Sequence, residues 1–452
     1  MFAVRAPRRG RSRSRNIVTV VAVVVALFVM AGGYLWHRYP MGEPSRFSDL
    51  TQQFKYGSIG NDIEVGMPLA VVKVLPRAFP EYLPPLPASV SGEAAKLPRD
   101  YTAFGFIQEP GHDMPIGFSV RTRIVPRTGP NCAACHTGSW KARPDERLVV
   151  RLGMPAANLN IGAFFTFLFK SARDPRFTAE YLLPLMEHDS PPLNAVDRAL
   201  YARLIIPGMK AGLVKRANMF DVFFNGTHPE FGYGRVDALN PWKLNQLAPL
   251  YPGGIPDSEA IGTVDFPAIW NQKIRQQMAL NWDGDSPKVR DRNVGAAFGA
   301  GASAETIDME GIELVSQFLL TLPAPAYPYH VDSSQLARGG RVFGQYCASC
   351  HAEGGARYGT VEPLDSVRTD PNRLHIYTER FNQQLLDYGK GYAWKITSMR
   401  KTNGYANAPL DGIWARAPYL HNGSVPTLWD LLTPEAQAER WQAHVLARHR
   451  TL

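Results

Sequence analysis

The sequence predicts a mainly α-helical chain that begins with a transmembrane helix and continues into two domains of similar construction. A largely helical, loop-rich insertion is expected between the two domains. Three observations lead to this fold class: an uncharged apolar run over residues 17–36, a C-x-x-C-H motif that occurs twice, and helical apolar periodicity in several segments around the motifs.

The composition excludes a disordered chain, because 45% of the 452 residues are apolar, and the length favours more than one domain. The formal net charge is +9, but six arginines within the first 16 residues supply most of it. Subtracting these six leaves +3 for the rest of the chain. No basic stripe with interleaved aromatic residues follows, so we expect no nucleic-acid partner.

Residues 1–16 form the predicted cytoplasmic basic segment, and residues 17–36 form the predicted transmembrane anchor. The apolar run is long enough to span a bilayer, the arginines keep its N-terminus in the cytoplasm, and Tyr34 and Trp36 suit the far interface. We therefore expect a single-pass protein of the bacterial inner membrane with its domains in the periplasm. A cleaved signal peptide is the alternative, but the run is long for one and no clean A-x-A site follows it.

The strongest signal comes from the cysteines, which lie in the stretches NCAACHTG and YCASCHAEG. The chain's cysteines are Cys132, Cys135, Cys347 and Cys350. Cysteines three apart on a helical turn face the same side, so they can form thioethers with the two vinyl groups of haem, and the next residue, His136 or His351, then reaches the iron. Disulfides or a zinc site would use the same thiols, but two copies that each end in histidine argue against both. We predict two covalently bound haem c groups.

Further segments follow the anchor in order. Residues 37–99 are expected to be a stem and lead-in without regular structure because of their prolines, Pro76, Pro80, Pro84, Pro85, Pro87 and Pro98. Residues 100–325 are the predicted N-terminal haem c domain with its insertion, in which residues 161–172 and 194–209 have helical periodicity. A helix containing Ile312, Val315 and Leu319 should end before Pro323.

Residues 326–436 are the predicted C-terminal cytochrome c domain, and residues 437–452 a basic tail. Leu336, Gly340 and Phe343 share one helical face just before the second motif. Near the other end, Leu428 and Leu431 share a face of a second expected helix.

The function depends on the sixth ligand of each iron, because a haem with two axial ligands transfers electrons whereas one with an open side binds oxygen or peroxide. The donors that follow the second motif are Met399, His375, His421, His444 and His449. His421 lies in a loop that has ligand-like features. Pro418 and Gly423 can fix its backbone, and Asn422 and Ser424 can hold the second ring nitrogen of the histidine or neighbouring carbonyls.

The stretches ARGGRVFGQYCASCH and PLDGIWARAPYLHNGSVPTLWDLL resemble the bacterial di-haem cytochrome c peroxidase superfamily, and within it the rubber-oxygenase-like (RoxA-like) branch. The resemblance covers most of the chain after residue 100 and is most specific in residues 334–352 and 410–432. It implies two cytochrome c-like haem domains, with a C-terminal haem held by His351 and His421. It also implies an N-terminal haem on His136 that has no strong protein ligand on its distal side.

The same resemblance makes Trp242, Trp270 and Trp282 candidates for residues that line the haem pocket or lie between the haems, with a purely structural role as the alternative. Two departures from the branch are evident: the chain is shorter than expected of a rubber oxygenase, and it carries the predicted anchor. A tethered protein cannot readily reach an insoluble external polymer, so cleavage of polyisoprene is not expected.

Two weaker motifs complete the candidate sites. Asn281, Asp283 and Asp285 place oxygen donors at alternate positions around a glycine, as a calcium loop does, but no downstream acid follows. His228 and Glu230 are possible acid–base groups for peroxide cleavage, with a surface loop as the alternative.

These observations favour a cytochrome c peroxidase-like oxidoreductase. Electrons would enter at the C-terminal haem from a small periplasmic donor cytochrome or a quinol-linked dehydrogenase, and peroxide or oxygen would react at the N-terminal haem. The alternatives are an electron-transfer cytochrome without its own substrate and a haem-dependent dioxygenase of a hydrophobic alkene.

Overall fold

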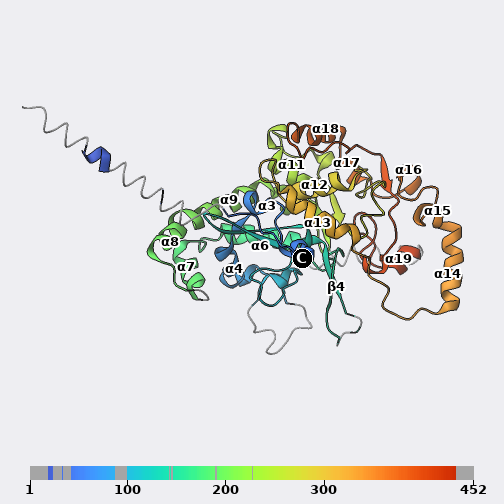
Figure 1. Cartoon of the computed structure of the whole chain (residues 1–452), viewed down its shortest axis with the longest axis horizontal. Coiled ribbons are helices and arrows are strands. Elements are labelled where there is room, and N and C mark those ends of the chain that lie inside the picture. The colour runs from blue at the N-terminus through green and yellow to red at the C-terminus, as the bar shows by residue number, and fades with distance from the viewer. Residues whose placement is uncertain are drawn as a thin grey trace, which may run out of the picture.

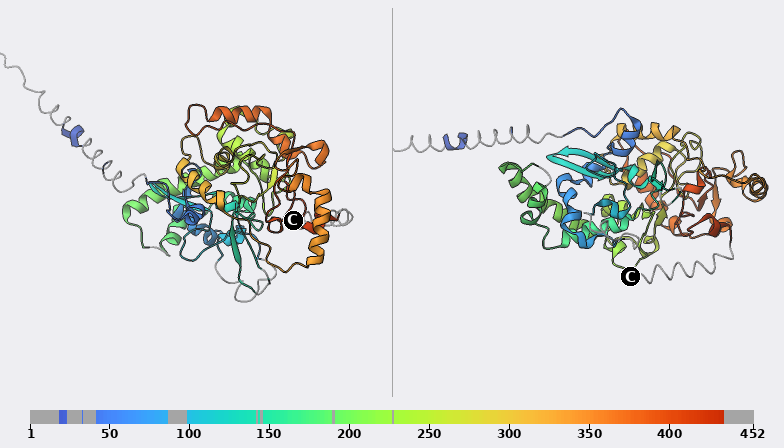
Figure 2. Two further views of the ribbon diagram at one scale, coloured as in Figure 1. Left: turned by 45° about the vertical axis from the view of Figure 1, so that its right-hand side comes forward. Right: turned by 90° about the horizontal axis from the view of Figure 1, so that it is seen from below.

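The computed structural model describes residues 19–23, 33, 42–86, 99–141, 143, 146–188, 191–226 and 228–433. Within these residues, the helices are joined by loops and by four small antiparallel sheets, which the predicted fold class did not include. The green helices α7 and α8 lie at one end of the body, and the orange helix α14 lies at the other, in all three views (Figures 1 and 2).

The predicted stem is folded over much of its length. It contains α2 (Leu50–Tyr56), α3 (Asn61–Glu64), β1 (Met67–Pro68), α4 (Leu69–Ala78) and η1 (Pro80–Tyr82). Pro76 lies inside α4, where it cannot donate a hydrogen bond, and the carbonyl of Val72 instead accepts one from the hydroxyl of Tyr101 at 2.7 Å. The expectation of irregular structure is therefore wrong for these elements, and at Pro76 the hydroxyl of Tyr101 takes the place of the missing hydrogen-bond donor.

The large aromatic core lies in the N-terminal half. Around it are η3 (Tyr101–Phe104), β2 (Phe118–Arg123), β3 (Val125–Pro130), α6 (Ile161–Arg173), α7 (Ala179–His188), α8 (Ala195–Leu200), η4 (Tyr201–Ile205), α9 (Ile206–Met219) and α10 (Asp221–Phe224). Strands β1, β3 and β2 form one sheet in that order. Phe104, Phe164 and Phe167 pack together in the aromatic core. The ring centroid of Phe104 lies 5.6 Å from that of Phe164 and 5.3 Å from that of Phe167. The two helical segments predicted from periodicity are confirmed by α6 and by the run from α8 to α9.

The middle of the chain surrounds the first C-x-x-C-H motif. Its elements are α5 (Cys132–Cys135), β4 (Thr137–Trp140), β5 (Val149–Leu152), β6 (Arg235–Asp237), α11 (Asn240–Gln246), η5 (Ala248–Leu250), η6 (Asp257–Glu259), β7 (Thr263–Asp265), α12 (Val289–Gly299) and α13 (Met309–Thr321). Strand β4 pairs with β5, and β6 pairs with β7. The predicted helix that ends before Pro323 is confirmed as α13, which buries Ile312, Val315 and Leu319.

The C-terminal part contains the second motif. Its elements are α14 (Ser333–Tyr346), α15 (Ala348–His351), β8 (Val361–Pro363), α16 (Leu364–Val367), α17 (Asn372–Ile376), α18 (Glu379–Tyr388), β9 (Gly404–Ala406), η7 (Ile413–Ala415) and α19 (Leu428–Leu432). Strand β8 pairs with β9. The two helices predicted around the second motif are therefore present as α14 and α19.

The structure corrects the prediction of an N-terminal transmembrane helix and, with it, the predicted single-pass location in the inner membrane. None of the helices in the described ranges is both long enough and apolar enough to cross a bilayer. Of the predicted anchor, the structure describes residues 19–23 and 33; the rest of residues 17–36 lies outside the described part. Residues 1–16 and 437–452 also lie outside the described residues.

Candidate haem sites

The first C-x-x-C-H motif forms the short turn α5, whose position is fixed by its neighbours. Asn131 caps the turn, because its Oδ1 accepts a 2.9 Å hydrogen bond from the backbone N–H of Ala133. Gly117 allows a close approach to α5: its φ is +96°, and a Cβ there would lie 2.2 Å from the backbone nitrogen of Ala134. These contacts determine where the two cysteine side chains lie.

His136 follows directly and is oriented as a metal ligand. Its Nδ1 lies 2.9 Å from the carbonyl oxygen of Pro267, and since a carbonyl only accepts, Nδ1 carries the proton. Burial, and to a smaller extent the charge of Arg292, lower the pKa of His136 to about 4, against the opposing effect of the Pro267 carbonyl. The imidazole is therefore neutral near pH 7 and keeps the lone pair of Nε2 for a metal.

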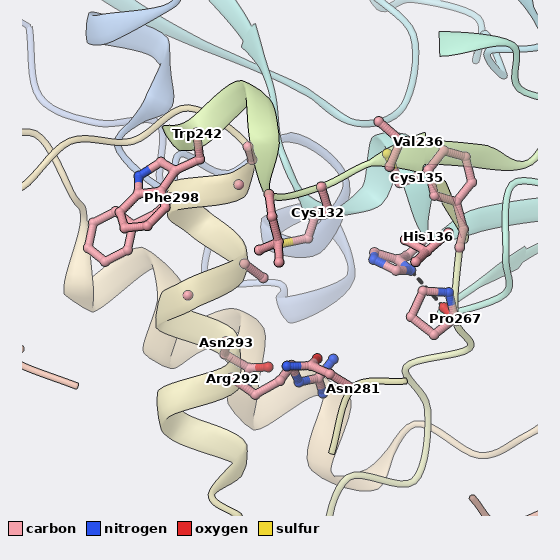
Figure 3. A pocket seen from close by; sticks show the side chains of 18 of the residues that line it. Cys132, Cys135, His136, Val236, Trp242, Pro267, Asn281, Arg292, Asn293 and Phe298 are labelled. Atoms are coloured by element: carbon pink, nitrogen blue, oxygen red, sulfur yellow. Dashed lines mark hydrogen bonds between the residues drawn. The ribbon is translucent and has the colours of Figure 1, made fainter. Parts of the chain in front are cut away.

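A cavity of about 310 Å³ adjoins this motif, and Cys132, Cys135 and His136 all line it. Its other walls come from β6, β7, α11, α12 and α13, and most of the lining side chains are apolar. Trp242 and Phe298 lie on one wall with ring centroids 5.9 Å apart (Figure 3). A mostly apolar cavity next to two thiols and a neutral imidazole suits a large, flat, apolar prosthetic group.

The wall opposite His136 is formed by α12, and one face of this helix includes two small residues that line the cavity. Arg292, Ala296 and Gly299 follow the i, i+4, i+7 spacing of one helical face, and all three line the cavity. Figure 3 shows α12 on one side of the cavity and His136 on the other. A methyl group and a glycine cannot bind iron, so this face contributes no strong ligand apart from the arginine at its end.

Met399 is the remaining soft donor on the cavity wall. It is buried, and the Cβ of an alanine at Gly295 would lie 2.8 Å from its methyl carbon, so the thioether packs against α12. The sequence placed Met399 among the donors available to the second haem. The structure instead places it beside the first motif.

Polar groups gather at one part of the cavity. Asn281, Asp285 and Arg292 all line it, and the Nδ2 of Asn281 donates a 2.6 Å hydrogen bond to Asp285. Burial and the neighbouring charge of Asp283 raise the pKa of Asp285 to about 8, against the opposing effects of Arg373 and Asn281. Asp285 therefore holds a proton near pH 7 at the edge of an otherwise apolar space.

The predicted calcium loop has a different environment from the one expected. Asp283 and Asp285 are 1% and 2% exposed, and both contact the guanidinium of Arg373, at 2.9 and 3.2 Å. Arg373 therefore already places a positive charge beside this pair of side chains. Calcium binding stays a prediction without support from this arrangement.

The second C-x-x-C-H motif spans the end of α14 and α15. The Nδ1 of His351 lies 3.1 Å from the carbonyl oxygen of Ala408, just as His136 contacts Pro267. Both histidines are therefore held by a main-chain carbonyl from a distant segment, which leaves Nε2 for a metal.

His421 is buried, with 4% of its surface exposed. Its Nε2 lies 3.2 Å from the hydroxyl of Tyr405 and 3.4 Å from Oδ1 of Asp370, and its ring lies 4.3 Å from that of Tyr405. Tyr405 is three residues before Ala408, so one short segment contacts both His421 and His351. Ligation of iron by His421 stays a prediction, because it requires Nε2 to leave these partners.

The loop around His421 has the restrained backbone that the sequence suggested. Gly423 has a φ of +62°, and the N–H of Ser424 donates to Oδ1 of Asn422 at 3.2 Å. Tyr419 and Val425 pair across the loop as an isolated bridge. Asn422 and Ser424 therefore bind each other rather than the imidazole in these contacts.

Strand β7 and the residues after it connect the two motifs. The N–H of Asp265 donates to the carbonyl of His421 at 2.8 Å, and two residues later the carbonyl of Pro267 accepts from His136. The indole of Trp282 donates to the carbonyl of Asp265 at 3.0 Å. The two candidate iron-binding regions are thus joined by three consecutive residues.

The three predicted tryptophans have different positions. Trp242 and Trp282 line the cavity, whereas Trp270 is fully buried in a separate cluster and donates to the carbonyl of Asp411 at 3.2 Å. His228 and Glu230 do not line the cavity, and Glu230 is exposed. The sequence analysis did not select Arg292. Its i, i+4, i+7 spacing with Ala296 and Gly299 is a signal in the sequence that could have drawn attention to it.

Comparison with known proteins finds a family match near the C-terminal end. Residues 404–442 match the family described as "RoxA-like, cytochrome c-like". This stretch is similar to a RoxA-like, cytochrome c-like domain. It includes Tyr405, Ala408 and His421, and a domain of this kind implies haem c.

Two uncharacterized proteins of Sinorhizobium fredii (strain NBRC 101917 / NGR234) are also similar to this chain. The protein y4iM is 32% identical over 202 residues, which cover 39% of this chain and 46% of y4iM. The protein y4iJ is 26% identical over 450 residues, which cover 75% of this chain and 73% of y4iJ. The chain thus spans less than half of y4iM.

The residues at the first motif fit a haem c group. Two thiols stand three residues apart, the adjacent histidine offers Nε2, and the cavity is mostly apolar. In addition, Trp242 Nε1 and Arg292 Nε are buried polar atoms of the cavity wall without a hydrogen-bond partner among the described residues.

Proposed function

We propose that this protein is a di-haem c-type cytochrome and oxidoreductase that reduces hydrogen peroxide at the haem of His136. The observation on which this rests is that α12 lies across the cavity from His136 (Figure 3) and that two of its cavity-lining residues, Ala296 and Gly299, carry no side chain that could bind iron. Haem bound there would supply an iron that changes oxidation state and binds such a ligand.

Two haems rather than one are supported by the equivalence of the two motifs. In each, a histidine follows the second cysteine and places Nδ1 against a main-chain carbonyl, of Pro267 in one case and of Ala408 in the other. This contact fixes the ring and raises its basicity as a metal ligand. A disulfide role would not require it.

The proposed electron route runs from the haem of His351 to that of His136. Residues 265–267 contact His421 at one end and His136 at the other, and Trp282 binds the carbonyl of Asp265. A small electron-donor cytochrome or a quinol-linked dehydrogenase is the proposed partner. Reduction of one hydrogen peroxide takes two electrons from this donor and two protons, and it gives two waters.

The cavity offers a group that can hold one of these protons. Asp285 lines it, and its raised pKa keeps the carboxyl protonated near pH 7. A buried acid with a pKa close to the working pH is suited to proton transfer. His228 and Glu230, the acid–base pair predicted from sequence, lie away from this space and have no role in the proposal.

An electron-transfer cytochrome without its own substrate is the second candidate, and Met399 favours it. A thioether on the cavity wall can become a sixth ligand, which would close the iron to peroxide. The two functions therefore differ in whether the sixth coordination position of the iron at His136 is open or filled by Met399.

Absorption spectroscopy of the haem-loaded protein separates them. We expect a high-spin ferric component and carbon monoxide binding to one of the two haems after reduction, both unchanged by Met399→Leu. Two low-spin haems without carbon monoxide binding would refute the enzyme. If Met399→Leu then created a carbon monoxide site, the electron-transfer function would be supported. Steady-state assays with peroxide and with oxygen plus an alkene then identify the substrate class.

A further inference from the structure

Arg292 differs from the other buried arginines of this region in having no partner. Arg373 contacts Asp283 and Asp285, and Arg416 contacts Asp411. The guanidinium of Arg292 makes no hydrogen bond or ion pair with any residue that the structure describes, and its Nε is buried. An enclosed cation without an acid is costly, so such a group indicates that an anion belongs beside it.

Arg292 is half-buried as a whole, and its Nε is buried in the cavity wall. Burial lowers the pKa of Arg292 to about 10, with a smaller contribution from the charge of Arg275. The side chain remains charged near pH 7 all the same. It therefore places a full positive charge on the wall of a mostly apolar cavity.

The position of Arg292 places its charge across the cavity from His136. Arg292, Cys132 and His136 line the same cavity, and Figure 3 shows Arg292 on the side of α12 and His136 on the other side. The charge therefore lies on the side that a haem bound through His136 would present to ligands.

We infer that Arg292 is the anion-binding residue of a ligand site on the haem face opposite His136. The inference rests on the proposed function, because it requires an iron that is open on that face. The guanidinium offers several N–H donors in one plane, which bind anionic oxygen or halide ligands more strongly than neutral donors do. In peroxide reduction it stabilises the negative charge that develops on oxygen, in an enclosed space where such a charge is little screened.

Fluoride and carbon monoxide distinguish this role from a structural one. Fluoride is an anionic ligand of ferric haem, whereas carbon monoxide is a neutral ligand of ferrous haem. In the haem-loaded full chain we expect Arg292→Gln to raise the fluoride dissociation constant by about 10- to 100-fold, as loss of a charge-assisted hydrogen bond does. Its carbon monoxide affinity should stay within about twofold of the wild type.

Matched variants control for charge and folding. Lys288→Gln removes the same charge from the exposed residue that precedes α12 and should leave fluoride binding unchanged. Arg292→Met, whose side chain suits the apolar wall, replaces Arg292→Gln if that variant does not take up haem.

Two results would overturn the inference, and they differ. A wild type that binds carbon monoxide, with equal fluoride affinity in the wild type and the neutral Arg292 variants, refutes the role of Arg292 but keeps the open haem. A shifted haem reduction potential in those variants would then point to a propionate partner. A wild type that binds neither ligand refutes the proposed function and the inference together.

Discussion

Asp285→Asn tests the buried carboxyl at the cavity wall. The pKa of Asp285 is raised from 3.8 to about 8, chiefly by burial and then by the charge of Asp283. Between these two values the folded protein binds a proton that the unfolded chain has released. Stability is then fully present below the unfolded pKa and is lost as the pH rises toward the folded pKa.

The magnitude follows from the shift. Each pH unit between about 4 and 8 costs up to about 1.4 kcal/mol, so the wild type should lose about 3 kcal/mol of unfolding free energy between pH 5 and pH 7 through this group alone. Asparagine has nearly the same shape, its oxygen can still accept from Asn281, and it does not titrate. The Asp285→Asn variant should lack this part of the pH dependence.

Urea unfolding of the wild type and Asp285→Asn at pH 5 and pH 7 measures the effect as a difference of differences. Titrating groups that do not interact with Asp285 cancel in it, and the interaction of Asp285 with Asp283 is included in the measured value. Asp365→Asn, which removes an exposed carboxylate, is the control and should retain the wild-type pH dependence. Parallel loss of stability in the wild type and Asp285→Asn would show that Asp285 does not hold the proton.

Two further predictions concern the iron ligand and the support of the first motif. His421→Ala should remove the low-spin signal of the C-terminal haem in electron paramagnetic resonance, and an unchanged signal would mean that another group is the sixth ligand. Gly117→Ala should cost about 3 kcal/mol or more, because its new Cβ would strike the backbone of α5. Gly111→Ala also has a positive φ but has nothing within 4 Å, so it should cost only about 1 kcal/mol in thermal unfolding, and equal costs would contradict the packing argument.

The chemistry of the first site was predictable wherever it is local in sequence. The spacing of Cys132, Cys135 and His136 identifies a haem c motif without any structure, because thioether formation and iron ligation use adjacent residues. The carbonyl that orients His136 belongs to Pro267, 131 residues away. A backbone carbonyl has no side-chain signature, so no sequence pattern could indicate this contact.

The error about the stem has a physical cause. Prolines between residues 37 and 99 suggested irregular structure, yet Tyr101 satisfies the carbonyl that Pro76 leaves free. Asp283 and Asp285 suggested calcium because their spacing is local, and calcium binding stays a prediction; Arg373, which contacts both side chains, is distant in sequence. In both cases a side chain distant in sequence makes a contact that the local pattern does not indicate.

Residues 265–267 link His136 of the first motif to His421. Asp265 and Pro267 are two residues apart, and their opposite contacts hold His421 and His136. A shift of this segment would therefore change the position of both histidines at once. Since Trp282 binds the carbonyl of Asp265 and also lines the cavity, it is placed to respond to both sites. This connection supports the proposed electron exchange between the two sites, because the segments that contact His421 and His136 are joined within three residues.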